Sequence, residues 1–351
     1  MSIKCYPILR VIIIIAINLT LLQVASAQFD TSAISASLKQ NNARFGKNFV
    51  FLLYKDGKPV YKKESLEFNV KTQQSIGATS QWLTAALLMT FVQEGKLSLD
   101  DKVSTYLPIF QKYYKGFITI RHCITHYTGI QSDEGVAKLF TKSKFSTLEE
   151  EVNDYAAKRD IKTNAGTEFR YSNMGFNIAG RVLEVIGKKN FDRLIRDRIL
   201  QPSGMKNTTF TNEDYNSAVS PATGARSTAT DLAMFMSMLM NKGMFNNKQV
   251  LNESSITMLH TLQVSPDKMK YIPSTMQNLD YGLGEWILET DAQGKPVTVG
   301  VPSLQGTWPM ADLCRRYAFV LFTKDIPGEQ KRDVYMNLKA SIDDGVPAAC
   351  N

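Results

Sequence analysis

The hydrophobic pattern of this chain centres on one long apolar segment, residues 81–95. Strong helix formers dominate it, no proline interrupts it, and Gly95 stands where a left-handed residue commonly ends a helix. Because apolar residues would occur on every side, the pattern predicts a buried helix. Its start follows the turn at residues 77–80, where unpaired backbone N–H groups and the positive end of the helix dipole are expected to converge. We therefore expect a site at this helix start.

Extended patterns occur near both ends of the chain. Residues 48–54 and 59–63 flank an Asp-Gly turn and predict a β-hairpin. Further strands are expected late in the chain, at residues 281–288, 296–301, 305–311 and 317–322. Helical patterns occupy residues 118–130 (from Thr119 as cap to Gly129), 175–187, 191–200, 229–240 (capped by Ser227 or Thr228), 254–262 and 328–343.

Strands at both ends with helices between them predict an α/β (α+β) fold. We expect one antiparallel sheet built from the N- and C-terminal segments and flanked by helices, with an all-helical lobe inserted in the middle. The lobe that contains the sheet would comprise about residues 40–75 and 225–351, and the helical lobe about residues 76–224. Together they would form one domain.

The first 27 residues have the features of a secretory signal. Lys4 and Arg10 provide the positive start, residues 11–22 are mostly apolar, and Ala25-Ser26-Ala27 is a small-residue cleavage site. The apolar part is short for a membrane span. We therefore expect a secreted or periplasmic protein that begins at Gln28 and keeps no stable membrane span.

The cysteines fit an oxidising compartment. One of the four leaves with the signal. Cys314 lies just before the last predicted strand, and the last predicted helix returns antiparallel along that strand, which brings Cys350 back near the strand start. We predict a disulfide between Cys314 and Cys350 and a buried free thiol at Cys123.

Charge excludes one class of partner. The formal net charge is +8, but the basic residues are scattered among acidic ones without a block of like charge. This distribution argues against a nucleic-acid-binding surface. No sequence feature calls for a cofactor.

Short motifs recur along the chain in a familiar order. They lie at residues 76–77, 83–85, 94–101, 118–130, 171–173, 201–205, 227–232, 281–284, and 306–307 followed by Asp312. This order resembles the serine β-lactamase and penicillin-binding-protein superfamily, closest to the branch of class C β-lactamases and D-alanyl-D-alanine carboxypeptidase-like esterases. The resemblance covers nearly all of the mature chain and implies the fold of a serine hydrolase.

The first catalytic motif of that family is lost. Active members carry Ser-x-x-Lys at the start of the central helix, with the serine as nucleophile and the lysine assisting its deprotonation. The resemblance places Ala78 at the serine position and Gln81 at the lysine position. Alanine has no attacking atom, and glutamine neither takes nor gives a proton at neutral pH. Neither Ser75 nor Ser80 has a lysine three residues later.

The second motif, Tyr171-x-Asn173, is intact. In relatives the tyrosine acts as general base or proton shuttle, and the asparagine orients lysine and substrate. Without a lysine neighbour, Tyr171 has little reason to ionise at pH 7. We therefore favour a structural role, with the asparagine capping the following helix.

The third motif, a Lys or His followed by a small residue and Gly, would fall on Val301-Pro302-Ser303. No cationic or imidazole side chain is present there, and Pro302 removes a backbone donor. His122 and His126 have the i, i+4 spacing of a metal pair, but this stretch matches a structural segment of the family and His260 lies elsewhere. We expect no metal.

Three hypotheses remain. The leading one is a pseudoenzyme that binds a carboxylate-bearing peptide, a cell-wall fragment or a protein partner in the old cleft, lined by Ala78, Thr79, Ser80, Gln81, Tyr171, Asn173 and Ser303. The alternative is an esterase or peptidase with a displaced nucleophile, Thr79 or Ser80, and Tyr171 as base. The third is an interaction protein in which Gln81 and Trp82 fill the cleft.

Overall fold

The computed structural model describes residues 30–65, 67–132, 143–211, 217–303, 306–324 and 332–350. The predicted signal, residues 1–27, lies outside these residues. One sheet of seven strands is central, in the order β2-β1-β13-β12-β11-β10-β9, and every neighbouring pair is antiparallel. The strands are β1 (Phe49–Lys55), β2 (Lys58–Lys63), β9 (Asp280–Tyr281), β10 (Trp286–Thr290), β11 (Pro296–Gly300), β12 (Thr307–Asp312) and β13 (Tyr317–Thr323).

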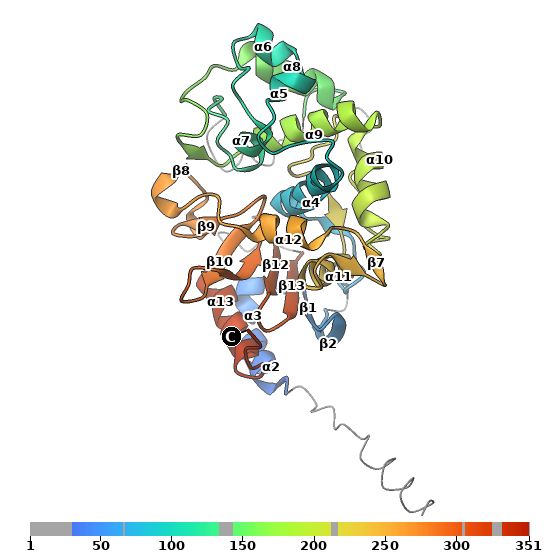
Figure 1. Cartoon of the computed structure of the whole chain (residues 1–351). Helices are drawn as coiled ribbons and strands as arrows, with labels where there is room; N and C mark the ends of the chain where they lie inside the picture. The colour runs from blue at the N-terminus through green and yellow to red at the C-terminus, as the bar shows by residue number, and fades with distance from the viewer. Residues whose placement is uncertain are drawn as a thin grey trace, which may run out of the picture.

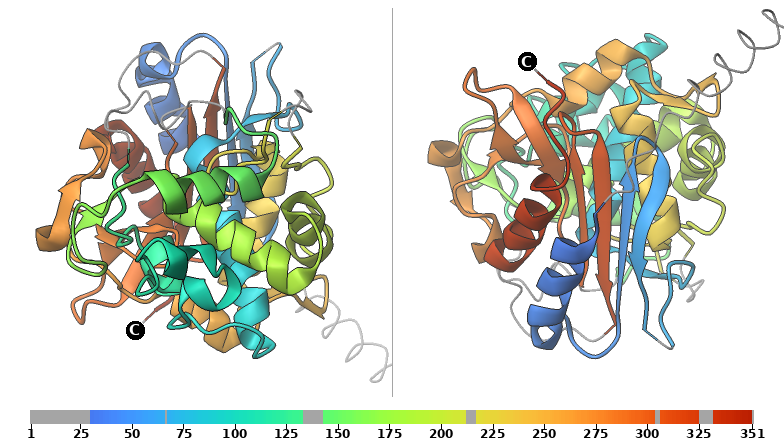
Figure 2. Two further views of the ribbon diagram at one scale, coloured as in Figure 1. Left: turned by 90° about the horizontal axis from the view of Figure 1, so that it is seen from above. Right: turned by 90° about the horizontal axis from the view of Figure 1, so that it is seen from below.

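Helices cover both faces of this sheet. The right view of Figure 2 shows α2 (Ser32–Gln40) and α13 (Arg332–Asp343) together on one face. The other face carries α4 (Ser80–Gln93), α11 (Ala229–Met240) and α12 (Glu253–His260). Because both faces are covered, β1 is apolar along its length: Val50 and Leu52 enter one core, while Phe51 and Leu53 enter the other.

A helical lobe lies above the sheet in Figure 1. It contains α5 (Val103–Tyr106), α6 (Ile109–Lys112), α7 (Ile120–Ile124), α8 (Leu148–Lys158), α9 (Met174–Gly187) and α10 (Phe191–Ile195). The other elements are α3 (Asn42–Phe45) and three short strand pairs: β3 (Gln74–Ser75) with β5 (Arg226–Ser227), β4 (Phe169–Arg170) with β8 (Met269–Tyr271), and β6 (Met244–Phe245) with β7 (Lys248–Gln249). The predicted fold class is thus confirmed.

Two element predictions were wrong in detail. The helix expected over residues 118–130 ends at Ile124, because the Thr125 hydroxyl donates to the Arg121 carbonyl and His126 adopts a left-handed conformation, with φ of 59°. The strand expected over residues 281–288 is split by a turn. At this turn Gly284 has φ of +77° and lies so close to α4 that a Cβ would approach Ala85 to 2.7 Å. Neither α2 nor α8 was predicted.

The C-terminus is tied to the sheet as predicted. Cys314 and Cys350 form a disulfide with their Cα atoms 5.0 Å apart, because α13 returns along the sheet. Cys123 is a buried free thiol, and burial raises its pKa. Within the described part of the chain, none of the helices has the length and hydropathy needed to cross a membrane.

Candidate functional site

The site begins where a short turn enters the central helix. Residues Gly77–Thr79 form one turn of 3₁₀ helix that continues directly into α4. Ala78, which the sequence resemblance places at the nucleophile position, is half-buried, whereas Thr79, Ser80 and Gln81 are fully buried. Helix α4 itself is buried from Ser80 to Phe91, as its all-round apolar pattern predicted.

The two hydroxyls beside Ala78 are both engaged with the backbone. Ser80 Oγ donates to the carbonyl of Gly77 at 2.6 Å and accepts the N–H of Ala225 at 3.0 Å. Thr79 Oγ1 donates to the carbonyl of Val301 at 2.8 Å. A hydroxyl whose proton is held by a carbonyl has no base to take that proton, so neither side chain is arranged as a nucleophile.

Gln81 ends a chain of hydrogen bonds that starts on the helical lobe. The backbone N–H of Ser172 donates to Nδ1 of His126 at 3.3 Å, so the proton of the imidazole is on Nε2. Nε2 then lies 3.0 Å from the hydroxyl of Tyr281, which donates to Oε1 of Gln81 at 3.5 Å. The uncharged amide of Gln81 is thus held by neutral groups.

Aromatic rings surround this chain. Tyr171 packs against His126 and Trp286, with ring centroids 4.5 Å and 5.7 Å away, and Trp286 packs against Tyr281 at 4.9 Å. Burial raises the pKa of Tyr171, and the polar neighbours Gln81 and Trp286 offset only part of that effect. The phenol is therefore neutral at pH 7 and does not serve as a general base.

His126 gives the site a pH dependence. Burial lowers the pKa of His126 to about 3, whereas an unfolded chain binds this proton near pH 6.5. A lowered folded-state pKa means that stability is complete above pH 6.5 and is lost as the pH falls toward 3. We expect a decline of up to about 1.4 kcal/mol per pH unit in this window.

The comparison of wild type with His126→Phe, by urea unfolding between pH 7 and pH 4, checks this expectation. The variant loses two hydrogen bonds and is less stable at pH 7, but its stability should fall less steeply with acid. All other ionisable groups are the same in both proteins, so the difference in slope reports His126. Equal slopes would contradict the neutral, buried state of this imidazole.

Residues 301–303 lie against the turn at residues 77–79. The Val301 carbonyl accepts a hydrogen bond from the Thr79 hydroxyl. Ser303 is buried, and its backbone N–H donates to the Thr307 carbonyl. No cationic side chain occupies positions 301–303. The structure therefore brings residues 77–79 and 301–303 together, and neither segment carries a charged side chain.

The expectation that Asn173 caps α9 was wrong, whereas His122 does have a structural role, at the start of α7. Asn173 is half-buried at the start of α9, but its side chain makes no capping hydrogen bond to that helix. His122 belongs to the capping box of α7, where its Nδ1 accepts the N–H of Thr119. Within the described ranges, no group of three His, Cys, Asp or Glu side chains is placed to hold a metal ion.

A buried polar cluster anchors the helix beside the site. Glu285 is fully buried, accepts the indole N–H of Trp82 at 2.6 Å, and contacts Nδ1 of His260 at 2.6 Å. Trp82 also packs edge-on against Phe235, so this ring belongs to the core and does not fill the cleft. The packing of Trp82 in the core is a correction to the hypothesis that Gln81 and Trp82 together fill the cleft.

Sequence reasoning missed Tyr281, Glu285 and Trp286 as neighbours of the site. Tyr281 was noted only as part of a matching stretch, and the other two follow it within five residues. Their contacts with Gln81, Trp82 and Tyr171 join segments about 200 residues apart or 115 residues apart along the chain. No local pattern could have signalled them.

Comparison with known proteins gives the same family. The profile of the Beta-lactamase family matches residues 44–340. Protein flp of Staphylococcus aureus (strain MW2) is 28% identical over 180 residues, which cover 47% of this chain and 35% of that protein. The match thus spans about a third of the length of this curated relative.

Solved structures share the fold. A penicillin-binding protein homologue from Caulobacter crescentus has a TM-score of 0.74 at 16% identity, covering 92% of this chain and 99% of the other. EstCE1, a hydrolase with promiscuous acyltransferase activity, has a TM-score of 0.72 at 19% identity, with coverage of 89% and 98%. At such identities the likeness shows the fold alone. Because the family profile matches residues 44–340, which are most of this chain, the chain belongs to the Beta-lactamase family.

Proposed function

We propose that this chain is a catalytically inactive, secreted or periplasmic member of the family that binds a carboxylate-bearing peptide or cell-wall fragment non-covalently. The observation that carries the proposal is Ala78 at the nucleophile position, with the hydroxyls of Thr79 and Ser80 both bound to backbone carbonyls. Losing the nucleophile of a serine hydrolase costs on the order of a million-fold in rate. The signal pattern and the disulfide support an extracytoplasmic location.

The neutral surroundings of Gln81 support the same proposal. The family lysine is replaced by an amide, Tyr171 is a neutral phenol, and His126 carries no proton on Nδ1 at neutral pH. Among the residues that the structure describes, neither the Thr79 nor the Ser80 hydroxyl donates to one of these groups. The alternative of a displaced nucleophile therefore has no observation in its favour.

The start of α4 supports a ligand with a negative group. Ala78 remains half-exposed directly before a helix of 14 residues, whose N-terminal dipole attracts anions. The carboxylate of a peptide is such a group. A protein partner that presents a chain end would use the same contact.

Covalent labelling tests the loss of catalysis. Wild-type protein incubated with a fluorescent penicillin and with a fluorophosphonate probe should show no adduct by gel fluorescence and intact-mass measurement. Heat-denatured protein controls for non-specific reaction, and an active family member controls for the probes. An adduct on residues 75–81 that disappears in Ser80→Ala would overturn the proposal in favour of the displaced nucleophile.

Calorimetry tests the binding. An acetylated peptide ending in D-alanyl-D-alanine should bind as the free acid and much more weakly as the C-terminal amide. Ala78→Phe, which fills the half-exposed position, should abolish binding, whereas the surface variant Lys248→Gln should not. Equal binding by Ala78→Phe would refute the assignment of this ligand to the old cleft.

A further inference from the structure

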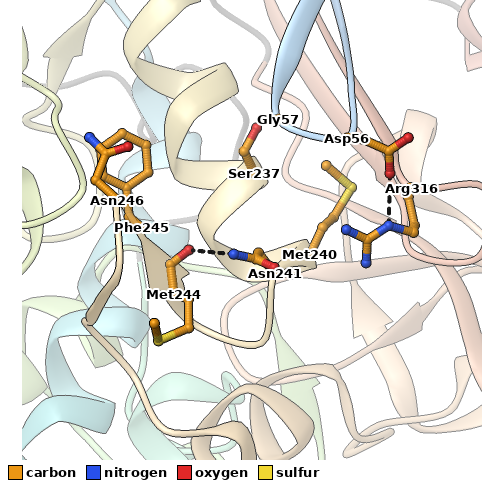
Figure 3. Close-up of a pocket in the computed structure, with 9 residues that line it drawn as sticks. All are labelled: Asp56, Gly57, Ser237, Met240, Asn241, Met244, Phe245, Asn246 and Arg316. Atoms are coloured by element: carbon orange, nitrogen blue, oxygen red, sulfur yellow. Dashed lines mark hydrogen bonds and ion pairs between the residues drawn. The ribbon is translucent and has the colours of Figure 1, made fainter. Parts of the chain in front are cut away.

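A second concave site lies at the opposite end of the sheet. A pocket of about 210 Å³ is formed by the β1–β2 turn, the end of α11, the β6–β7 hairpin and the β12–β13 turn (Figure 3). The candidate site adjoins the start of β12, where Gln74 contacts Thr307. The pocket adjoins the other end of β12, so a strand length of roughly 20 Å separates the two.

Arg316 supplies unused donors to this pocket. Its Nε donates to Oδ1 of Asp56 at 2.8 Å, and Lys55 also binds the Asp56 carboxylate. One carboxylate thus faces two cations, which leaves one positive charge in excess. The Nη groups of Arg316 make no hydrogen bond to any residue that the structure describes, and the side chain is 45% exposed. Figure 3 shows the guanidinium beside Asp56 at one side of the pocket.

The facing wall is apolar with a polar rim. Met240, Met244 and Phe245 line it, and Asn241 Nδ2 donates to the Met244 carbonyl, which fixes the hairpin against α11. Asn246 closes the edge with φ of 46° and an exposed amide. A charged donor opposite methionine and phenylalanine side chains suits an amphipathic ligand with an anionic end.

The last turn of α11 lines the pocket with Ser237, Met240 and Asn241. The carbonyls of Ser237 and Met238 already accept the backbone N–H of Asn241, and Met238 also accepts that of Gly243. The excess positive charge of Lys55 and Arg316 over Asp56 therefore favours a negative group over a positive one at this pocket.

We propose that this pocket binds the carboxylate of a small apolar amino-acid derivative, with the Arg316 Nη groups holding the carboxylate and Met240, Met244 and Phe245 contacting the side chain. The volume equals about seven water molecules and is below the roughly 300 Å³ of drug-sized sites, so the ligand is about one residue in size. A free N-acyl amino acid and the last residue of a peptide share this chemistry. The site is separate from the Ala78 cleft.

Titration with N-acetyl-methionine, followed by two-dimensional NMR of the full protein, tests the proposal. We expect saturable shifts of the Met240, Met244 and Asn246 signals, and at least about tenfold weaker binding of N-acetyl-methionine amide. Arg316→Gln should weaken binding by a similar factor, whereas Lys248→Gln should change it little. An amide that binds as well as the acid, or unchanged binding by Arg316→Gln, would overturn the proposal.

A second variant guards against a local structural effect at Arg316. Asn246→Asp places a negative charge at the rim, and aspartate tolerates the left-handed conformation as asparagine does. This variant should weaken the binding of N-acetyl-methionine but not the binding of N-acetyl-methionine amide. A tripeptide ending in methionine distinguishes a free N-acyl amino acid from the end of a peptide as the ligand. A site for peptide ends should bind the tripeptide with the same affinity as N-acetyl-methionine, whereas a site for the free derivative should bind it more weakly. Ala78→Phe should leave this binding unchanged, so failure here is distinguishable from failure of the cleft proposal.

Discussion

Replacing Gln81 by lysine is expected to lower the free energy of unfolding by about 4 kcal/mol at pH 7, which corresponds to a lysine pKa depressed by about three units. The side chain of Gln81 is fully buried, and its polar neighbours Tyr171, Tyr281 and His126 are all neutral. The buried carboxylate of Glu285 is already bound by Trp82 and His260. An ammonium at position 81 would therefore lack a counter-ion.

The sign of the pH effect identifies the cause. The folded variant would hold lysine with a pKa of about 7.4, whereas the unfolded chain keeps it protonated up to about pH 10.4. The deficit should therefore shrink as the pH rises toward 10. Gln81→Met, uncharged and of similar size, is the matched control, with a smaller loss that does not vary with pH. Urea unfolding at pH 7 and pH 9.5 separates the two, and a pH-independent deficit in the lysine variant would refute the argument.

Replacing Lys339 by methionine is expected to cost about 3–5 kcal/mol of stability, because it removes the buried cation that pairs with the buried carboxylate of Asp312 and with two further carboxylates. Lys339 is 1% exposed, and its Nζ lies 2.7 Å from Glu289, 3.2 Å from Asp312 and 2.7 Å from Asp343. Burial opposes the charge, but the hydrogen bonds to Asp343 and Glu289 outweigh it and raise the pKa of Lys339. This cation joins α13 to the sheet.

Lys324→Met is the control for Lys339→Met. Its Nζ pairs with Glu67 at 3.6 Å, and both side chains are at least half exposed. Removing such a pair costs at most about 1 kcal/mol. Chemical unfolding of both variants at pH 7 checks the difference. A Lys339 variant within 1 kcal/mol of wild type would show that Arg315, which also contacts Asp312 and Asp343, compensates for the loss.

Much of the fold was predictable because its signals are local. The hairpin at β1 and β2 follows from two extended runs around Asp56-Gly57, and α4 follows from an apolar run without breakers. The errors came from contacts between distant segments. Gly284 bends the chain past Ala85 of α4 and splits the predicted strand, and His126 ends α7 early by turning inward to Tyr281.

The candidate site was likewise predictable from the sequence only in part. That no nucleophile stands at position 78, and no lysine at position 81, could be read from the chain alone, because the identity of a side chain is independent of its surroundings. The state of the remaining groups depended on the tertiary structure. The carbonyl that accepts the Ser80 proton is local, three residues back, but the other partners are distant: that of Thr79 lies 222 residues away, the backbone donor to Ser80 145 residues away, and the partner of Gln81 200 residues away. Only packing brings these atoms within hydrogen-bond distance, and that packing engages the two hydroxyls and keeps His126 and Tyr171 neutral.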